Sequence, residues 1–339
     1  MRKIFAIILT AALLFAGCSR DYSEEVAISL AAGSVSVSTR VTDDIIQDAL
    51  FDDGEQIDVF VTDLTGEITY AQPQVYTANG TTAVGSVTGN ALETSPAQFY
   101  PRGSVSIKAY YPQGFAGTAT TGTETFTVSD DQSDFAGYKA SDLMAAAVPS
   151  QAPTSHAVNL PFSHKLARVV VYLETMTGFT ISDVVSIKVA AKRKADFDKE
   201  TFATTLTATG NDFEDITIAG TGGRIGACIV PPQMLDVTAG TTDYLVKIEL
   251  GSGSHQYVYY RNTAPLQLME GNTYLLRLNC SSAVITGYTT VVDSWSSAAS
   301  EKELLGELLK LIEGTATITP FTDGSTTSGI ISWGEELDS

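Results

Sequence analysis

Apolar and polar residues alternate with a period of two along most of this chain, and no other feature of the sequence constrains its fold as strongly. The alternation recurs in short runs, for example over Val105–Ala109, Val185–Val189 and Ile216–Ile218. Clusters of Gly, Pro, Asn, Asp and Thr separate these runs at intervals of about 8–15 residues, as turns separate strands. Strands with one buried and one solvated face form antiparallel sandwiches. The pattern therefore predicts an all-β fold and not a doubly wound parallel sheet.

The length of the chain predicts two domains, because it has 339 residues and a domain takes roughly 150. We place the boundary at about residue 165, which predicts an N-terminal sandwich domain over 26–165 and a C-terminal one over 166–296. Segment 145–157 contains small residues and prolines and carries no charge. We therefore expect it to be a surface loop near the domain junction.

A helix is predicted near the C-terminus. Ser300 with Glu303 forms a capping box, and Gly314 is a stop signal. The apolar stripe between them consists of Leu304, Leu305, Leu308, Leu311 and Ile312. We expect the helix over 300–313 to pack on the second domain or, alternatively, to dock a partner. It belongs to a terminal region over 297–339.

The composition argues against catalysis and against nucleic-acid binding. The formal charge is −19, from 20 Lys and Arg against 39 Asp and Glu, and such a surface repels phosphate backbones. Three histidines and three cysteines are too few for a Cys/His metal cluster, and the sequence has no nucleophile elbow, phosphate loop or dinucleotide motif. We expect no enzyme, no cofactor and no bound metal. His164 is interpreted as a hydrogen-bonded structural residue.

The first residues have the pattern of an export signal. Arg2 and Lys3 precede an apolar stretch over 4–15, which is shorter than the about 20 residues of a membrane-spanning helix. Leu14–Cys18 resembles the lipobox of bacterial lipoproteins, in which the signal is cut before the cysteine and its thiol is acylated. We expect a signal peptide over 1–17, lipid on Cys18, an acidic tether over 18–25 and a lipid-anchored position on the outer membrane, at the cell surface. An ordinary signal peptide with an incidental cysteine is the alternative.

Cys228 and Cys280 are the cysteines that remain beside Cys18. Both lie in apolar alternating segments. An oxidising compartment permits a disulfide between them, and two buried thiols are the alternative. The sequence leaves both possibilities open.

Five short motifs resemble those of fimbrillin-like proteins from Bacteroides and its relatives, in the order in which that family has them. The motifs are Gly54–Phe60 (GEQIDVF), Lys108–Pro112 (KAYYP), Asp142–Met144 (DLM), Phe162–Val169 (FSHKLARV) and Gly271–Tyr274 (GNTY) with Leu278 and Trp295. Glu55 and Asp58 stand where the family has Asp and Gly. The resemblance covers residues 26–296.

The resemblance implies two tandem transthyretin-like antiparallel β-sandwich domains, exported as a lipoprotein and assembled into surface fimbriae. In stalk members of the family an arginine-specific protease removes the first strand region, and a strand of another subunit fills the vacant groove. Arg40 is the candidate cleavage site in this chain, with a basic residue beside an ordinary turn as the alternative. Cleavage there would release Val26, Ile28, Leu30, Val35 and Val37. Their burial amounts to about 5–15 kcal/mol, which becomes available to an incoming strand.

Two apolar alternating segments near the C-terminus are candidates for the donor strand. They lie within 315–321 and 329–333. Their large apolar side chains are Ile318, Phe321, Ile330, Ile331 and Trp333. The alternative is a terminal hairpin that closes the sheet of the second domain. The chain would then be a capping or tip subunit of the fibre.

The leading hypothesis is a structural subunit or tip adhesin of a surface fimbria. Its partners are then other fimbrial subunits, the outer membrane through the lipid, and host or bacterial surface ligands, but not nucleic acid. The alternative is a surface lipoprotein that binds glycans or other ligands and does not polymerise, and a secreted hydrolase is the third hypothesis. The aromatics that could stack on sugars are Tyr110, Tyr111, Tyr257, Tyr259, Tyr260 and Trp333. Core packing and cross-strand pairing are the other roles for these rings.

Overall fold

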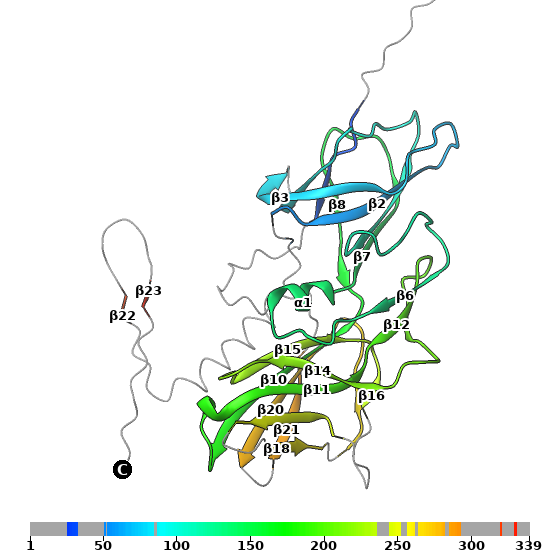
Figure 1. Cartoon of the computed structure of the whole chain (residues 1–339). Helices are drawn as coiled ribbons and strands as arrows, with labels where there is room; N and C mark the ends of the chain where they lie inside the picture. Colours follow the sequence, from blue (N-terminus) through cyan, green and yellow to red (C-terminus); the bar gives the residue numbers. More distant parts are fainter. Residues whose placement is uncertain are drawn as a thin grey trace, which may run out of the picture.

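The structure is a computed structural model that describes residues 26–32, 51, 53–84, 87–235, 244–251, 256–261, 264–281, 285–292, 319–320 and 329–330. Nearly all of its regular elements are β-strands (Figure 1), which confirms the all-β prediction. The helical elements among the described residues are α1 (Phe135–Ala140) and a 3-10 turn, η1 (Ile181–Asp183). Neither they nor any other helix in this part of the chain has the length and hydropathy to cross a membrane.

The first half of the chain forms an eight-stranded sheet in the order β8-β1-β4-β3-β2-β5-β7-β9. Its strands are β1 (Leu30–Ala32), β2 (Gln56–Asp63), β3 (Gln74–Val84), β4 (Val87–Glu93), β5 (Val105–Tyr111), β7 (Met144–Gln151), β8 (Val158–Leu160) and β9 (Ser163–His164). In β5 the inward residues Val105, Ile107 and Ala109 are buried, as period-two alternation requires. They join Ile57 and Val59 of β2 in one hydrophobic core.

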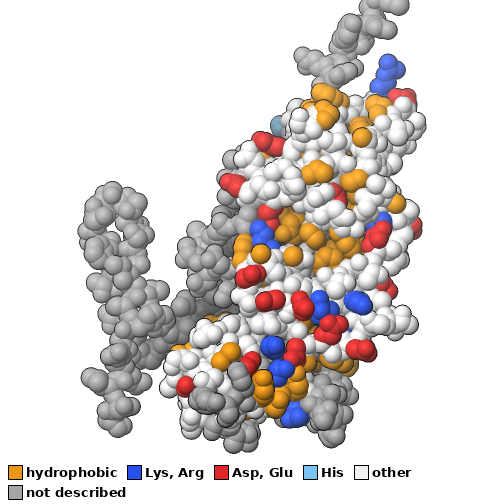
Figure 2. Space-filling model, in the orientation of Figure 1, with side chains coloured by type: hydrophobic (Ala, Val, Ile, Leu, Met, Phe, Trp, Pro, Cys, Tyr) orange, Lys and Arg blue, Asp and Glu red, His pale blue; other side chains and the backbone are white. Residues whose placement is uncertain are grey.

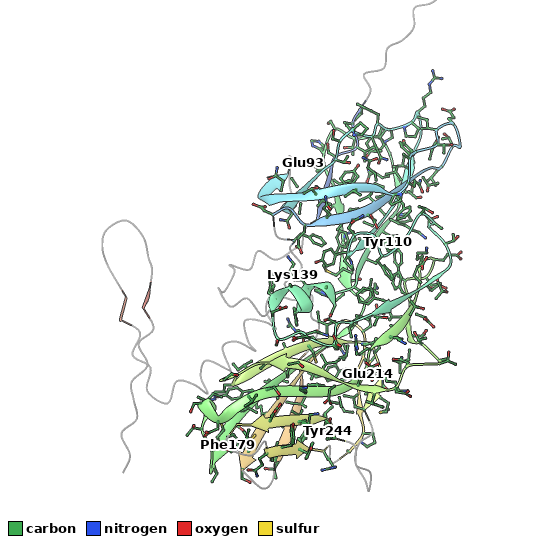
Figure 3. All side chains as sticks on the ribbon, in the orientation of Figure 1. Glu93, Tyr110, Lys139, Phe179, Glu214 and Tyr244 are labelled. Carbon is green, nitrogen blue, oxygen red and sulfur yellow. The ribbon has the colours of Figure 1, made fainter. Side chains whose placement is uncertain are left out.

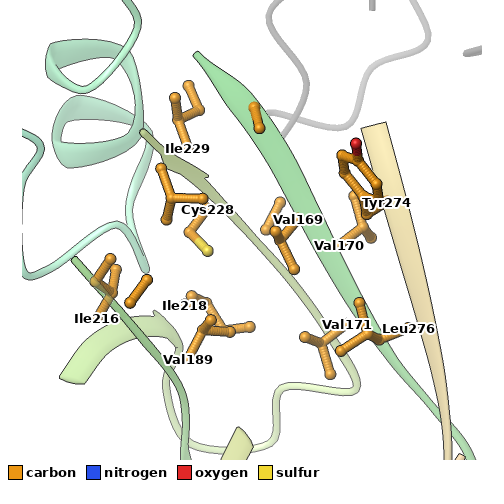
Figure 4. Packing of buried hydrophobic residues seen from close by; sticks show 14 of the residues in the cluster. Val169, Val170, Val171, Val189, Ile216, Ile218, Cys228, Ile229, Tyr274 and Leu276 are labelled. Carbon is orange, nitrogen blue, oxygen red and sulfur yellow. The ribbon is translucent and has the colours of Figure 1, made fainter. Parts of the chain in front are cut away.

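The second half forms two four-stranded sheets that share a second core. One sheet has the order β15-β10-β20-β21 and the other β14-β11-β17-β18. Their strands are β10 (Ala167–Thr177), β11 (Val184–Lys192), β14 (Phe213–Ala219), β15 (Ile225–Val230), β17 (Val246–Leu250), β18 (Gln256–Tyr260), β20 (Thr273–Ser281) and β21 (Ile285–Val292). Figure 4 shows Val169 and Val171 of the first sheet packed with Val189 and Ile218 of the second. Two short strands, β16 (Met234–Leu235) and β19 (Leu266–Gln267), pair with each other.

A small three-stranded sheet joins the two halves. Strand β6 (Thr123–Thr127) of the first half pairs antiparallel with β12 (Lys194–Asp198) of the second, and β12 also pairs with β13 (Thr204–Leu206) (Figure 1). Beside it lie five aromatic rings, which we call the junction cluster: Tyr110, Phe115, Phe126, Phe197 and Phe202. Neighbouring ring centroids in this cluster are 5.3 to 6.1 Å apart.

Polar side chains cross the same junction. The side chain of Gln132 donates to Ile229 O at 3.0 Å and accepts from Ile229 N at 2.8 Å, so it pairs with β15 as a strand would. The buried ammonium of Lys199 donates to Ala116 O and to the carboxylate of Glu124, both at 2.9 Å. The two halves are therefore packed together through apolar contacts and hydrogen bonds.

Part of segment 145–157 is a strand that begins with buried residues, so the loop prediction is wrong there. Residues up to Gln151 belong to β7, which lies inside the first sheet between β5 and β9. A run of alanines shows no polar–apolar alternation and thus gives no strand signal. The structure shows why the residues are small and apolar on both faces: Ala146 belongs to the core of the first half, whereas Ala145 belongs to the core of the second.

Cys228 of β15 and Cys280 of β20 are free, buried thiols and form no disulfide. Burial raises the pKa of Cys280 to about 12 and also raises the pKa of Cys228. Both therefore stay protonated and pack as small apolar side chains.

Asp63 holds the turn at the end of β2. Its carboxylate accepts hydrogen bonds from the backbone N–H groups of Thr65, Glu67 and Ile68, each at 2.8 Å. Burial raises the pKa of Asp63, but these hydrogen bonds together outweigh burial and lower the pKa below its ordinary value.

We expect the substitution Asp63→Asn to lower the urea midpoint of unfolding at about pH 7, and to have less effect in acid. A carboxyl whose pKa is lowered in the folded state stabilises the fold above its ordinary pKa, and this contribution disappears as the pH falls through the lowered pKa. The midpoints of wild type and variant should therefore converge below about pH 4. A difference between the midpoints that stays constant with pH would contradict this account.

Several predicted features lie outside the described residues. These are Cys18, Val35, Val37, Arg40, Trp295, the helix over 300–313, Ile318, Phe321, Ile331 and Trp333. Ile330 belongs to β23 (Gly329–Ile330), which pairs antiparallel with β22 (Thr319–Pro320). Within the described part of the chain these two strands pair only with each other.

Candidate functional site

β1 is a short strand that its sheet holds on both edges. On one edge it pairs antiparallel with β4, where Leu30 lies opposite Leu92 and Ala32 opposite Asn90. On the other edge it pairs parallel with β8, where Leu30 lies opposite Val158. We call the space between β4 and β8 that β1 fills the β1 seat. If β1 left this seat, both neighbouring strands would expose unpaired backbone groups.

The residues before β1 continue its pairing with the sheet. Ile28 N donates to Gln98 O at 2.8 Å, and Tyr100 N donates to Val26 O at 2.9 Å. The chain before β1 therefore runs antiparallel beside the loop that follows β4. Backbone hydrogen bonds thus anchor the segment on both sides of Ile28.

The side chains of this segment fill part of the first core. Ile28 is 5% exposed and Leu30 is 2% exposed, and both pack with Ala32 in the cluster that contains Ile57 and Tyr76. The burial of Ile28 and Leu30 contributes on the order of 3–6 kcal/mol. The three residues are two apart in sequence, so any strand with apolar side chains at every second position could make the same contacts.

Phe51 and Asn90 form a clamp at the end of the β1 seat. The buried Asn90 side chain donates to Phe51 O and accepts from Phe51 N, each at 2.8 Å. The Phe51 ring packs against Tyr111 and Phe162, at centroid distances of 5.3 and 5.0 Å. The chain at residue 51 is therefore fixed to the sheet by contacts that β1 does not supply. The sequence has no signal for this clamp, because Asn90 recognises the backbone of a residue 39 positions away.

Motifs from separate parts of the sequence meet where the chain passes from the first sheet to the second core. His164 Nδ1 lies 2.9 Å from Asp142 Oδ1, and both side chains are buried. Gly271 N donates to Leu166 O at 2.8 Å. The DLM, FSHKLARV and GNTY motifs are thereby joined, and His164 is the hydrogen-bonded structural residue that the sequence predicts.

The first two motifs also contact each other. Glu55 accepts a hydrogen bond from the Tyr111 hydroxyl at 2.9 Å. It also pairs at 2.5 Å with Lys139 of α1, which Figure 3 labels. The buried Asp58 accepts from Gly114 N at 2.7 Å. Burial raises the pKa of Asp58, although this hydrogen bond acts in the opposite direction. The carboxylates of Glu55 and Asp58 thus hold Tyr111, at the end of β5, and Gly114, in the turn that follows it.

Three of the aromatics that the glycan-binding alternative names as sugar contacts are buried, as the core-packing interpretation of these rings expects. Tyr110 lies in the junction cluster, the Tyr111 hydroxyl donates a hydrogen bond to Glu55, and Tyr260 belongs to the core of the second half. Tyr257 and Tyr259 are exposed, at 43% and 37%. Trp333 lies outside the described residues.

No three His, Cys, Asp or Glu side chains of the described residues are grouped so that they could hold a metal ion. A cavity of about 300 Å³ lies between α1 and the glycine-rich turn after β14, lined by Asp134, Tyr138 and Gly222 among others. Asp134 caps α1 by accepting a hydrogen bond from Gly137 N at 2.7 Å. The Asp134 carboxylate in the lining of this cavity therefore serves as the N-cap of α1.

Comparisons with known proteins agree with this architecture. A family model described as fimbrillin-like matches residues 39–295. A proposed cell adhesion protein from Bacteroides uniformis is similar in structure, with a TM-score of 0.56 and 21% identity over 81% of this chain and 99% of that one. A second proposed cell adhesion protein, from Bacteroides ovatus, has a TM-score of 0.54 and 17% identity over 79% of this chain and 96% of its own. These likenesses show the fold. A search of curated proteins found no match.

Proposed function

Because the chain belongs to the fimbrillin-like family, whose model matches most of its length, we propose that it is a structural subunit or adhesin of a cell-surface fimbria. The resemblance predicted from the five motifs is confirmed by that match. The observation that carries the proposal further is the position of β1. A short segment near the N-terminus occupies the β1 seat, between two strands that could pair with an incoming strand instead.

In this proposal, subunits assemble by strand exchange at the β1 seat. Removal of β1 exposes the backbone edges of β4 and β8 and the apolar surface that Ile28 and Leu30 cover. A donor strand of another subunit then restores both the hydrogen bonds and the burial. The candidate donors are the apolar segments of the C-terminal region that contain Ile318, Phe321, Ile330, Ile331 and Trp333.

Cleavage at Arg40 is the proposed trigger for the exchange. Arg40 lies in the sequence between β1 and Phe51, so a cut there separates β1 from the clamp. The clamp would keep residue 51 on the sheet while the cut segment, which includes Val26, Val35 and Val37, becomes free to leave. Val26 through Ala32 would then be held only by the contacts of the seat itself.

The export pattern supplies the location in this proposal. Acylation of Cys18 would tether the uncleaved chain to the outer membrane through residues 18–25, and a cut at Arg40 would separate the chain from this anchor. Host or bacterial surface ligands are then the partners of a tip subunit, and neighbouring subunits are the partners of a stalk subunit.

Treatment of the purified full-length chain with an arginine-specific protease tests the proposal. We expect the cleaved chain to form a ladder of oligomers that resists SDS, because strand insertion buries both backbone edges and apolar side chains. The variant Arg40→Gln should stay monomeric, whereas Arg102→Gln, which removes an exposed arginine of the first half, should form the ladder as wild type does. A chain that mass spectrometry shows to be cut at Arg40 and that remains monomeric would overturn the proposal.

A further inference from the structure

Two tyrosines stand on the outer face of an edge strand in the second half of the chain. β18 is the last strand of its sheet, and its register with β17 places Tyr257 opposite Glu249 and Tyr259 opposite Lys247. The intervening Val258 is buried, so Tyr257 and Tyr259 point away from the core, at 43% and 37% exposure.

Tyr244 completes a row of three rings on this surface, which we call the tyrosine row. The ring centroid of Tyr244 lies 4.9 Å from that of Tyr259, and the Tyr257 ring is stacked on Tyr259 at 6.4 Å. In Figure 2 hydrophobic side chains form a patch on the second half of the chain, flanked by positive and negative groups, and Figure 3 labels Tyr244 in this region. The row is therefore an aromatic surface that solvent reaches.

Neighbouring charged side chains hold the tyrosine row in place. The Tyr244 hydroxyl donates to Asp215 Oδ1 at 2.6 Å, and the Lys247 ammonium pairs with the other oxygen of Asp215. The same ammonium lies 5.3 Å from the Tyr244 ring centroid and 5.7 Å from that of Tyr257. Burial alone would lower the pKa of Lys247, but its hydrogen bonds with Asp215 and Tyr244 outweigh burial and raise the pKa. Lys247 thus stays charged, and rings that are already ordered lose little freedom when a ligand binds.

Arg261 adds a positive charge at the end of the row. Its guanidinium lies over Tyr259, 5.9 Å from the ring centroid, and its side chain is exposed. Lys247 is neutralised by Asp215, whereas no carboxylate among the described residues pairs with Arg261. A planar guanidinium in this position can bind a carboxylate through two hydrogen bonds.

We propose that the tyrosine row and Arg261 form a binding site for an acidic oligosaccharide. A pyranose ring has an apolar C–H face that can pack on the solvent-exposed parts of the Tyr257 and Tyr259 rings, and a polar rim that water or side chains can satisfy. The carboxylate of a uronic acid unit would pair with Arg261. This site lies in the second half of the chain, away from the β1 seat, so it is present before cleavage and does not depend on strand exchange.

Binding of two sugar hexamers to the uncleaved full-length chain tests the site. We expect hexagalacturonate to bind more tightly than a galactose hexamer, as measured by calorimetry. Tyr257→Ala and Tyr259→Ala should each weaken hexagalacturonate binding about tenfold, and the corresponding Phe variants should keep most of the affinity because stacking needs only the ring. Arg261→Gln should remove the preference for the acidic hexamer.

Phe213→Ala is the matched control, because Phe213 is 44% exposed on β14, at the other edge of the same sheet. Its binding should equal that of wild type. No binding of hexagalacturonate by the wild type would overturn the proposal. So would a hexagalacturonate affinity that both alanine variants retain, or a preference for the acidic hexamer that survives in Arg261→Gln. If an alanine variant fails to fold, the Arg261→Gln variant still tests the proposal.

Discussion

Replacing Phe197 with alanine should lower the free energy of unfolding by about 3–5 kcal/mol. The Phe197 ring is fully buried in the junction cluster, and its centroid lies 6.1 Å from Tyr110, 5.8 Å from Phe115 and 5.9 Å from Phe202. Tyr110 and Phe115 come from the first half of the chain, and Phe202 comes from the second. The substitution therefore opens a cavity between the two halves, where neither can close it alone.

The same substitution should destabilise both halves together. The core of the second half extends through the junction cluster to Phe60 and Tyr110 on the strands of the first sheet. We therefore expect one cooperative urea transition at a lower midpoint, with faster hydrogen exchange in strands of both halves. Phe213→Ala removes an equally large but exposed ring and should change the stability by less than about 0.5 kcal/mol. Two separate transitions in the wild type, of which Phe197→Ala shifts only one, would contradict a shared junction.

The alternation of apolar residues predicts much of this fold because each half buries one face of its strands. Val105, Ile107 and Ala109 are inside, as that pattern requires. The pattern fails for Ala145 and Ala146, which face different cores on the two sides of one strand. Period-two analysis assumes that one face of a strand meets water, so it cannot detect a strand that is covered on both.

The candidate site is predictable only in part, for a related reason. Ile28 and Leu30 show in the sequence as an apolar pair two residues apart, and both are buried in the first core. The Phe51–Asn90 clamp is a contact between a side chain and a distant backbone, which leaves no spacing or composition to recognise. The tyrosine row depends likewise on the register of β17 and β18, which places Lys247 opposite Tyr259. The local sequence pattern shows which residues alternate as apolar and polar. The clamp and the tyrosine row depend instead on which strands become neighbours in the folded sheet, and the pattern does not contain this information.

The clamp and β1 act on the same strand, and this has a consequence for exchange. β1 pairs with β4 along Leu30–Ala32, and Asn90, opposite Ala32, holds Phe51. While β1 is present, both sets of contacts hold this end of β4 in the sheet. Once β1 has left, its hydrogen bonds to β4 are lost, and of these two sets of contacts only the Asn90–Phe51 hydrogen bonds remain.

Asn90→Leu should therefore lower the free energy of unfolding by about 2–5 kcal/mol, because the buried N–H and C=O groups of Phe51 each lose their partner. Leucine has the same branched shape and the same number of side-chain heavy atoms as asparagine, so the lost hydrogen bonds and not a cavity dominate the change. Asn79→Ala, on the exposed face of the neighbouring strand β3, is the control and should change the stability by less than about 0.5 kcal/mol. Urea unfolding followed by circular dichroism measures both.

The effect of Asn90→Leu should be larger after cleavage at Arg40 than before it. In the uncleaved chain β1 still covers the edge of β4, so part of the local structure survives the loss of the clamp. Once β1 has left the cleaved chain, neither contact remains. We then expect the urea midpoint to fall further and the yield of SDS-resistant oligomers to drop, because an incoming strand meets a seat that is no longer ordered. Equal effects of the substitution on the cleaved and uncleaved chains would show that the clamp stabilises the fold without preparing the seat for a donor strand.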